Sequence, residues 1–326
     1  MKEEFNKQTV LITGASGFIG SHLTRRLTEL GANVHILVRD NSNLWRITDI
    51  LGKGITVWKA EINESDKIKD YLKQICPKRV FHLAAIVNPE RSLENIEKVI
   101  DVNIKGTVAL IKALQDIPLE CFVNVGTCEE YGDNAAPFNE TLRESAVSPY
   151  SASKISATHF CQMIHKIAAM PVVTVRPFLT YGPYQLSNLL IPSLIRYCLN
   201  NEKEFRMTSG EQTREFNFVG DIVEGMLKAS LCRELIGGII NVGNGKEYKI
   251  IDVARMIVNL MNSPLALNRS LNHRKGEVFH FYSATDKYIG FLKPSSFTSL
   301  EDGLKITIDW YTKNWKDLPA FAKKIS

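Results

Sequence analysis

The sequence predicts an α/β protein with a doubly wound parallel sheet, and three observations support this fold class. A short apolar run at 10–13 leads through a glycine-rich turn into a helical pattern at 21–30. Further apolar runs of strand length alternate with helical stretches, which is the order expected of parallel strands covered by helices on both faces. The chain has 326 residues, of which 44% are hydrophobic, so it can bury a large core.

The strands that we expect after the first one are all short and apolar. They span residues 34–38, 55–58, 79–83, 121–125, 172–175 and 239–242. A parallel sheet of this Rossmann type binds ligands at the carboxyl ends of its strands. After residue 177 the alternation weakens, so we expect a smaller lobe that is interleaved with the sheet domain.

Residues 14–20, Gly-Ala-Ser-Gly-Phe-Ile-Gly, join the first strand to the first helix. Gly14 suits a tight turn, Gly17 lets the backbone approach a pyrophosphate, and Gly20 permits close packing of the helix. The amino end of the helix adds unpaired N–H groups and a positive dipole, which favour phosphates. The pattern predicts a dinucleotide site, although a purely structural glycine turn has the same spacing.

Tyr150 and Lys154 are four residues apart, so a helix would place both on one face. There the ammonium would lower the pKa of the phenol and let it act as an acid or base at neutral pH. By itself the pair also fits an exposed tyrosine beside a solvated lysine. The glycine-rich turn favours the catalytic interpretation.

Charge and composition limit the class of protein. The net charge of +5 is small and the basic residues are interspersed with acidic ones, so we expect an anionic small substrate and no nucleic acid partner. No apolar segment approaches the roughly 20 residues that span a bilayer, and the first residues lack the apolar stretch of a signal peptide. We expect no membrane association and a cytoplasmic location. Six cysteines without Cys-x-x-Cys spacing indicate reduced thiols and no metal site.

Together, the glycine turn and the Tyr150–Lys154 pair resemble the extended short-chain dehydrogenase/reductase family, in particular its enzymes that modify nucleotide sugars. The resemblance extends over nearly the whole chain. Its other landmarks are Phe-His-Leu-Ala-Ala at 81–85, Asp-Val-Asn-Ile-Lys-Gly-Thr at 101–107, Gly-Thr-Cys-Glu-Glu-Tyr-Gly at 126–132, Arg-Pro-Phe at 176–178, Tyr-Gly-Pro at 181–183, Gly-Glu-Gln-Thr-Arg-Glu-Phe at 210–216 and Asn-Val-Gly at 241–243.

The resemblance implies that a nicotinamide dinucleotide lies along the glycine turn and the loops after the next strands. The residues implied are Gly14, Ser16, Gly17, Phe18, Ile19, Gly20, Arg39, Glu61, Ile62, Leu83, Ala84, Ala85, Asn103 and Lys154. Glu61 matches a position, more often aspartate, that contacts the adenine amino group, but an exposed glutamate without a role fits as well. Asn103 matches an asparagine that steadies the active-site helix, and a buried asparagine with no chemical role is equally compatible.

The end of the second strand bears on the choice of cofactor. An acidic residue there hydrogen-bonds the ribose of NAD, whereas an arginine favours the phosphate of NADP. Val38 stands where relatives that use NAD usually have aspartate, and Arg39 follows it. We therefore predict NADP, with Arg46 as a second charge, and keep NAD as the alternative through Asp40.

The resemblance assigns the chemistry to four residues, Thr127, Tyr150, Lys154 and Glu129. Thr127 and Tyr150 would hold the reacting oxygen of the sugar over the nicotinamide. Nucleotide-sugar 4,6-dehydratases have Thr-Asp-Glu or Thr-Ser-Glu where this chain has Thr-Cys-Glu at 127–129. The base position is filled, but cysteine is a poor general acid for a hydroxyl leaving group.

Cations would bind the two negative charges of a nucleoside diphosphate sugar. Arg214 and Arg274 match family arginines that bind the diphosphate and the nucleotide. Leu179 stands where relatives usually have an asparagine that touches the substrate, and Asn188 could compensate. We expect Glu130 to point away from the site.

We predict hydride chemistry at C4 of a nucleotide-linked hexose. The first prediction is an NADP-dependent reductase of a nucleoside diphosphate 4-keto-6-deoxyhexose, of the kind that serves cell-surface polysaccharide biosynthesis. Alternatives in the same family are a 4-epimerase and a 4,6-dehydratase that uses Glu129. An alternative of another class is a non-catalytic NADP-sensing protein, and the presence of Thr127, Tyr150 and Lys154 argues against it.

The expected domains follow from this assignment. Residues 1–178, with 215–245 returning to them, would form the NADP-binding Rossmann domain. Residues 179–214 and 246–326 would form the nucleotide-sugar-binding lobe. By resemblance, the helices near 97–114 and 150–167 of two subunits would pack into a four-helix bundle, so we expect a homodimer.

Overall fold

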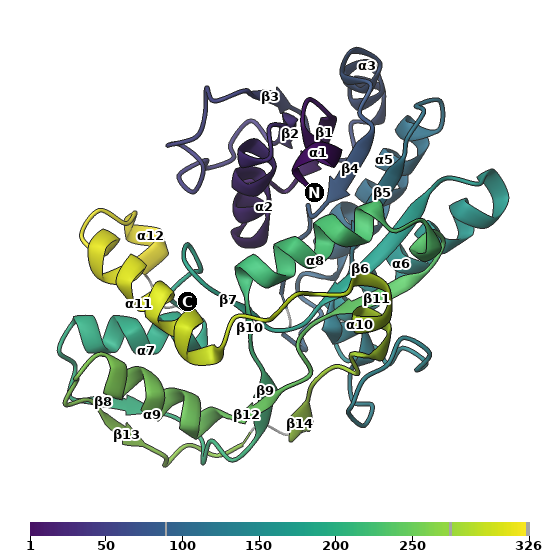
Figure 1. Ribbon diagram of the computed structural model, residues 1–326. Coiled ribbons are helices and arrows are strands. Elements are labelled where there is room, and N and C mark those ends of the chain that lie inside the picture. Colours follow the sequence, from purple (N-terminus) through teal and green to yellow (C-terminus); the bar gives the residue numbers. More distant parts are fainter. Residues whose placement is uncertain (89, 274–275, 324–326) are drawn as a thin grey trace.

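The computed structural model describes residues 1–88, 90–273 and 276–323, and within them a seven-stranded parallel sheet organises the chain (Figure 1). The strands lie in the order β11-β6-β5-β4-β1-β2-β3, and all neighbouring pairs are parallel. Their bounds are β1 (Thr9–Thr13), β2 (Asn33–Val38), β3 (Ile55–Lys59), β4 (Arg79–His82), β5 (Cys121–Val125), β6 (Val172–Pro177) and β11 (Ile239–Val242). Each expected apolar run is one of these strands, so the predicted fold class is confirmed.

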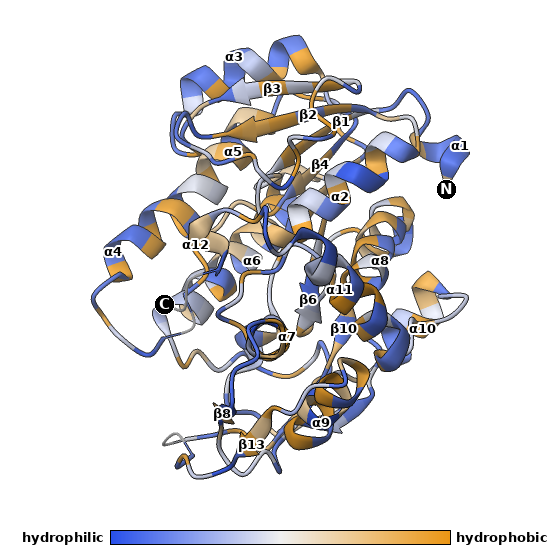
Figure 2. Ribbon diagram, turned by 90° about the vertical axis from the view of Figure 1, so that its left-hand side faces the viewer, coloured by the Kyte–Doolittle hydropathy of each residue, from blue (hydrophilic) through white to orange (hydrophobic). Residues whose placement is uncertain are grey.

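Helices cover both faces of the sheet. One face is packed by α2 (Phe18–Glu29), α8 (Val219–Leu231) and α10 (Asp286–Leu292), and the other by α3 (Ser65–Ile75), α5 (Gly106–Leu114) and α6 (Pro149–Ala168). Strands β4, β5 and β6 are buried at every position because their side chains meet helices on both sides. Figure 2 shows the same pattern as hydrophobic colour along β1 and β2.

A smaller group of elements lies beyond the carboxyl ends of the strands, at the lower left of Figure 1. It has two small sheets, in the orders β12-β9-β14 and β13-β8, and its own hydrophobic core. Its elements are α7 (Leu190–Leu199), β8 (Glu204–Arg206), β9 (Thr213–Glu215), β12 (Glu247–Lys249), α9 (Ile250–Leu260), β13 (Ala266–Asn268), β14 (His280–Phe281), α11 (Leu300–Asn314) and α12 (Ala320–Lys323).

The remaining elements are short connections. They are α1 (Lys2–Phe5), α4 (Ile96–Val99), the π-helix η1 (Ile100–Lys105), the 3-10 helices η2 (Cys128–Tyr131) and η3 (Arg233–Leu235), and the paired strands β7 (Thr180–Tyr181) and β10 (Asn217–Phe218).

Helix α10 differs from the expected division of the chain. It lies within the range 246–326 that we assigned to the smaller lobe. However, its Tyr288 and Leu292 belong to the hydrophobic core around α2 and α8, not to the core of the smaller lobe. After the expected return at 215–245, the chain therefore packs against the large sheet a second time, through α10.

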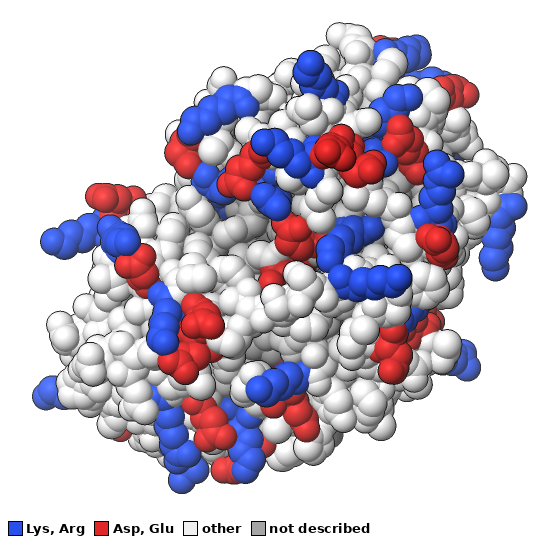
Figure 3. All heavy atoms as spheres, viewed as in Figure 1, with Lys and Arg blue, Asp and Glu red and all other residues white. Residues whose placement is uncertain are grey.

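The surface carries both signs of charge. Figure 3 shows lysines and arginines interspersed with carboxylates over the face that is viewed. Across the described part of the chain, no helix is long and apolar enough to cross a membrane.

We predict that Gly20→Ala destabilises the protein and impairs nucleotide binding. A Cβ at position 20 would lie 2.2 Å from the carbonyl oxygen of Gly14, so α2 must move away from the turn. Overpacking of this kind costs about 1–3 kcal/mol, which denaturant unfolding measures.

Gly290→Ala is the matched control, because a Cβ there meets no atom within 4 Å. It lies in helix α10, where alanine is expected to leave the free energy of unfolding unchanged or raise it by up to about 1 kcal/mol. Equal effects of the two substitutions would contradict the close approach of Gly20 and Gly14.

Candidate active site

The glycine-rich turn lies at the carboxyl end of β1 and opens onto α2. Gly14 has a φ of +77°, which favours glycine, and a Cβ there would lie 2.7 Å from backbone atoms of residues 83–84. Gly17 is the N-cap of α2, whose first turn has no side-chain cap and no acidic residue. The N–H groups and the positive dipole of this helix end suit a pyrophosphate. The turn therefore fits the phosphates of a dinucleotide.

A buried histidine holds the loop that faces this turn. His82 Nδ1 lies 2.7 Å from Thr13 Oγ1, and Nε2 lies 2.9 Å from Thr107 Oγ1. Thr13 Oγ1 also accepts a hydrogen bond from the N–H of Ala84 at 3.2 Å. Burial, with the charge of Lys154, lowers the pKa of His82 to about 3, so the ring is neutral at pH 7. We had not singled out His82, although a histidine in an apolar strand marks it in the sequence.

The residues that we assigned to the adenosine end of the cofactor lie at the open edge of the sheet. Arg39, Asp40 and Glu61 are all exposed. Ile62 is buried against Gly106, where a Cβ would lie 2.5 Å from Ile62 Cγ2. The structure thus places an exposed arginine and an exposed aspartate next to each other after the end of β2.

Arg46 is buried, in contrast to Arg39. Its Nη1 donates to the carbonyl of Ser16 at 3.1 Å, and its Nε donates to the carbonyl of Tyr184 at 2.9 Å. Its guanidinium carbon lies 4.6 Å from the ring centroid of Trp45. Burial lowers the pKa of Arg46 to about 10, and no carboxylate in the described residues forms an ion pair with it. Arg46 thereby joins the glycine turn to the segment that begins the smaller lobe.

Helix α6 brings together the proposed catalytic pair. Its N-cap, Ser148, forms a capping box with Ser151, so the helix begins just before Tyr150. Tyr150 and Lys154 are 7% and 3% exposed, respectively. Thr127 is the N-cap of η2 after β5, and its side chain is near enough to Tyr150 to lower the pKa of the phenol. Three of the four predicted catalytic residues therefore meet at one place.

The electrostatics of this group differ from our expectation. Burial raises the pKa of Tyr150, and the nearby side chain of Thr127 lowers it by less. Burial also lowers the pKa of Lys154. We predicted that the ammonium would depress the pKa of the phenol. Instead, loss of water around the phenol has the largest effect on its pKa, and Glu130 and Glu129 raise that pKa further.

Asn103 links the loop after β4 to the active-site helix. It lies in the π-helix η1, and its Nδ2 donates to Ile86 O at 3.0 Å and to Ser153 Oγ at 2.9 Å. Its Oδ1 accepts from the N–H of Ile86 at 2.8 Å. Ser153 stands next to Lys154 on α6. Asn103 holds this position from within a π-helix. The sequence pattern did not predict this local helix type.

Glu129 lines a cavity of about 530 Å³ between the sheet and the smaller lobe. Burial raises the pKa of its carboxyl, and the cations of Arg214 and Arg91 lower it. The cavity is also lined by Gly132, Val147, Leu179, Gly276, Glu277, Val278, Phe281 and Glu90. Leu179, which we singled out from the sequence, is thus one of the residues that line this cavity.

The two neighbours of Glu129 face elsewhere. Cys128 is 4% exposed, and burial raises the pKa of its thiol well above the usual value. Glu130 is fully buried, where it forms an ion pair with Arg176 at 2.8 Å. Our expectation that Glu130 points away from the cavity agrees with this pairing.

The predicted substrate residues are distributed differently. Arg214 lines the cavity, where its Nη2 lies 2.7 Å from Glu277 Oε1. Asn188 is exposed in the loop before α7, away from the cavity lining. Arg274 lies outside the described residues. Sequence reasoning missed Arg91 and Glu277, which come from loops and have no motif that would mark them.

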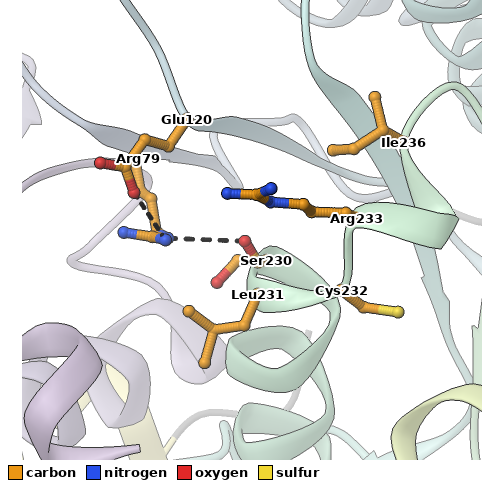
Figure 4. A pocket seen from close by; sticks show the side chains of 7 residues that line it. All are labelled: Arg79, Glu120, Ser230, Leu231, Cys232, Arg233 and Ile236. Atoms are coloured by element: carbon orange, nitrogen blue, oxygen red, sulfur yellow. Dashed lines mark hydrogen bonds and ion pairs between the residues drawn. The ribbon is translucent and has the colours of Figure 1, made fainter.

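A second hollow lies at the opposite end of the strands. It has a volume of about 160 Å³ and is lined by Arg79, Glu120, Arg233 and residues at the end of α8 (Figure 4). Arg79 Nη2 is already paired with Glu120 Oε2 at 2.7 Å. Since ligands of this fold bind at the carboxyl ends of strands, the first cavity is the candidate active site. Among the described residues, no group of three His, Cys, Asp or Glu side chains could hold a metal ion.

Comparison with known proteins agrees with this geometry. Residues 10–243 match the model of the NAD dependent epimerase/dehydratase family. The dTDP-D-glucose 4,6-dehydratase of Dictyostelium discoideum is 32% identical over 276 residues, which are 79% of this chain and 63% of that relative's length. The chain thus spans less than two thirds of that relative.

Two solved structures cover nearly the whole chain. The epimerase Mth375 of Methanothermobacter thermautotrophicus has a TM-score of 0.89 and 31% identity, over 97% of this chain and 95% of its own. A UDP-glucuronic acid 4-epimerase variant of Bacillus cereus, in complex with UDP-4-deoxy-4-fluoro-glucuronic acid and NAD, has a TM-score of 0.84 and 27% identity. Its alignment covers 93% of this chain and 99% of its own.

Proposed function

This chain belongs to the NAD dependent epimerase/dehydratase family, and from that premise we propose that it is a 4-epimerase of a nucleoside diphosphate sugar. The chain is an enzyme of the extended short-chain dehydrogenase/reductase type, as its sequence motifs predicted. The reaction that we propose is redox-neutral overall, since the cofactor ends each turnover in the state in which it began.

The side chains on α6 and η2 support this chemistry. A nicotinamide bound along the glycine turn would supply hydride transfer from and to C4, and inversion would require the 4-keto sugar to present its opposite face before the hydride returns. Tyr150 accepts the proton of the C4 hydroxyl and later returns it to the oxygen. Thr127 hydrogen-bonds the same oxygen, and Lys154 stabilises the phenolate through its charge.

The comparisons favour an epimerase or a dehydratase over the reductase that we predicted first. The relative from Dictyostelium is named a 4,6-dehydratase, and both solved structures are epimerases. None of these three is a dedicated 4-ketoreductase. A sensor without turnover is disfavoured because the chain belongs to an enzyme family and retains Thr127, Tyr150 and Lys154.

The burial of Cys128 is the observation that favours the epimerase over the dehydratase. A dehydratase needs a general acid at this position to protonate the leaving C6 hydroxyl. A buried thiol whose pKa is raised is a poor general acid for the C6 oxygen as it leaves. The 4,6-dehydratase remains the second candidate because Glu129 lines the cavity, where it could serve as the base that removes the C5 proton.

We propose that the sugar nucleotide lies in the cavity beside Glu129, with its diphosphate at Arg214. Arg214 is paired with Glu277, so the diphosphate would compete with that carboxylate for the guanidinium. Asn188 and Arg274 stay predictions for the same ligand. In this proposal residues 1–178 and 215–245 bind the dinucleotide, and the smaller lobe binds the sugar nucleotide. A cytoplasmic location and a role in polysaccharide biosynthesis also stay predictions.

The cofactor is a pyridine nucleotide, and Arg39 supports our proposal of NADP. The solved B. cereus epimerase contains NAD, and Asp40 offers a carboxylate for the ribose of NAD in this chain. Mass spectrometry of the nucleotide released from purified protein distinguishes the two, because NADP carries one additional phosphate.

We propose a homodimer, supported by an apolar stripe on α6 and η1. Phe160, Met163 and Ile167 are exposed at helical spacing, and Ile100 is exposed on the neighbouring η1. We expect Ile167→Glu to give a monomer in sedimentation velocity. Ile289→Glu is the control, since Ile289 is similarly exposed on α10. A wild-type monomer, or a dimer that survives Ile167→Glu, would contradict the proposal.

We predict that Tyr150→Phe lowers the rate of 4-epimerisation by about 10²- to 10⁴-fold, the usual contribution of a positioned acid or base. The test incubates the holoenzyme with UDP- and dTDP-linked hexoses and uronates and identifies the products by NMR. Tyr71→Phe is the matched control, because the Tyr71 hydroxyl donates to Lys59 O at the end of β3, the edge strand farthest from β6 in the strand order. Unchanged epimerisation in Tyr150→Phe would show that the phenol is not the acid or base.

Glu129→Gln separates the two candidate reactions. An epimerase does not need this carboxylate as a base, so we expect 4-epimer to form at a rate within about tenfold of wild type, as expected when only binding is disturbed. A dehydratase would lose about 10²- to 10⁴-fold of its elimination rate. A wild-type product that lacks the C6 oxygen would reject the epimerase and support the second candidate.

A further inference from the structure

A buried ion pair lies directly behind the turn that holds Thr127. Glu130 on η2 and Arg176 on β6 are both 0% exposed. Arg176 Nε lies 2.9 Å and its Nη2 2.8 Å from Glu130 Oε2. The same Nη2 lies 2.7 Å from Glu144 Oε1, whose side chain is 17% exposed. One arginine thus binds an inner and an outer carboxylate.

The inner carboxylate makes contacts that the outer one does not. Glu130 Oε1 accepts a hydrogen bond from the N–H of Thr127 at 2.9 Å. Glu130 Oε2 accepts one from Thr158 Oγ1 at 3.0 Å, and Thr158 lies on α6 one turn beyond Lys154. A single carboxylate therefore connects the turn of Thr127, the strand β6 and the helix that presents Tyr150.

The surrounding backbone is shaped around this pair. A Cβ at Gly126 would lie 2.4 Å from Glu130 Oε1 and 3.3 Å from Arg176 Cγ. The ring of Tyr131 lies under the guanidinium, with 4.7 Å between the guanidinium carbon and the ring centroid. Burying two charges costs desolvation, and apolar side chains of similar volume often stabilise a protein as well or better. We therefore attribute to the ion pair an effect on local geometry rather than a gain in stability.

We propose that Glu130 is a positioning residue for catalysis, which holds Thr127 and the first turns of α6 in the geometry where both contact one substrate oxygen. The proposal rests on the proposed function, because the oxygen in question is that of the sugar. Glu130 does not touch the substrate, since its carboxylate is occupied by Thr127, Thr158 and Arg176. Its effect passes through Thr127 and α6.

The charge of Glu130 also reaches the catalytic pair. Tyr150 faces Cys128, Glu129 and Glu130 from η2, and the negative charges of Glu130 and Glu129 raise the pKa of the phenol. Lys154 faces Glu130, Cys161 on its own helix and His82 on β4. Removing the charge of Glu130 should therefore lower the pKa of Tyr150 and that of Lys154. The rising limb of the pH profile, which needs an ionised phenol, moves to lower pH.

Two substitutions provide a matched test, because each leaves Arg176 with one carboxylate. Glu130→Gln leaves one oxygen and places an amide N–H₂ against the donors of the other, so one side chain no longer accepts from both the turn of Thr127 and α6. Glu144→Gln removes only the outer carboxylate. In the holoenzyme we expect Glu130→Gln to lower kcat about 10- to 100-fold, as small misplacements of reacting groups do. KM for the sugar nucleotide should stay within about twofold, since the binding groups are untouched. Glu144→Gln should leave kcat within about twofold, as for a partly exposed pair.

The pH profile and hydrogen exchange complete the test. We expect the rising limb to move to lower pH in Glu130→Gln and to stay in Glu144→Gln. Amide exchange should become faster in peptides that cover 126–131 and 149–158 in Glu130→Gln only. This readout needs no turnover, so it tests the connection even if the sugar substrate is a different one. A wild-type enzyme without turnover would reject the proposed function, whereas unchanged exchange in Glu130→Gln would reject the positioning role.

Thr158→Val keeps the proposal testable if Glu130→Gln fails to fold. Valine has nearly the shape of threonine, and this change removes the hydrogen bond to α6 without unpairing a charge. We expect kcat to fall at least about threefold at constant KM, which corresponds to the loss of one hydrogen bond. A kcat equal to that of wild type in Thr158→Val, or in a folded Glu130→Gln, would overturn the inference.

Discussion

The close approach of Gly14 and Gly20 is the constraint on which the active site depends. The carbonyl of Gly14 lies where a side chain at position 20 would begin, and residues 83–84 lie against Gly14 from the other side. The glycine turn, the start of α2 and residues 83–84 can therefore meet only if α2 begins in contact with the carboxyl ends of the strands. This contact brings the N–H groups of α2 to the same edge of the sheet as Thr127 and α6.

Loss of water is the dominant electrostatic effect at the catalytic residues. Burial shifts four pKa values in the direction that favours the neutral form of the group. It raises those of Tyr150 and Cys128 and lowers those of Lys154 and His82. Burial at this site therefore disfavours the charged form of each group, and contact with an ionic partner opposes that effect. The positive ring of an oxidised nicotinamide is such a partner for the phenolate. The buried ion pair of Glu130 and Arg176 is the exception, because there each charge already has its counterion.

Local patterns made the strands and the glycine turn predictable. Runs such as 121–125 and 172–175 are apolar because they are covered on both faces, and this burial leaves a continuous signal in the sequence. The Tyr150–Lys154 pair was also predictable, because both residues lie on one helix and their separation in the sequence fixes their separation in space. The direction of the pKa shift of Tyr150 could not be predicted, since it depends on how completely distant segments cover the phenol.

Contacts between residues far apart in the chain could not be predicted from the sequence. Glu130 and Arg176 are 46 residues apart, and neither their pairing nor the contact of Glu130 with Thr158 follows from a period or a motif. The lining of the cavity by Arg91 and Glu277 depends on loops whose paths the sequence does not specify. Helix α10 returned to the large sheet because Tyr288 and Leu292 fill its core, whereas chain order had suggested the smaller lobe.

The two hydrogen bonds of Arg46 join the two parts of the molecule to which we assign the two ligands. Its guanidinium donates to the carbonyl of Ser16, in the turn proposed for the dinucleotide, and to that of Tyr184, at the start of the lobe proposed for the sugar. Swinging that lobe outward would strip a buried cation of its acceptors, which is costly. The smaller lobe can therefore move away from the sheet only if Arg46 gives up the carbonyl of Tyr184 or the glycine turn moves with it.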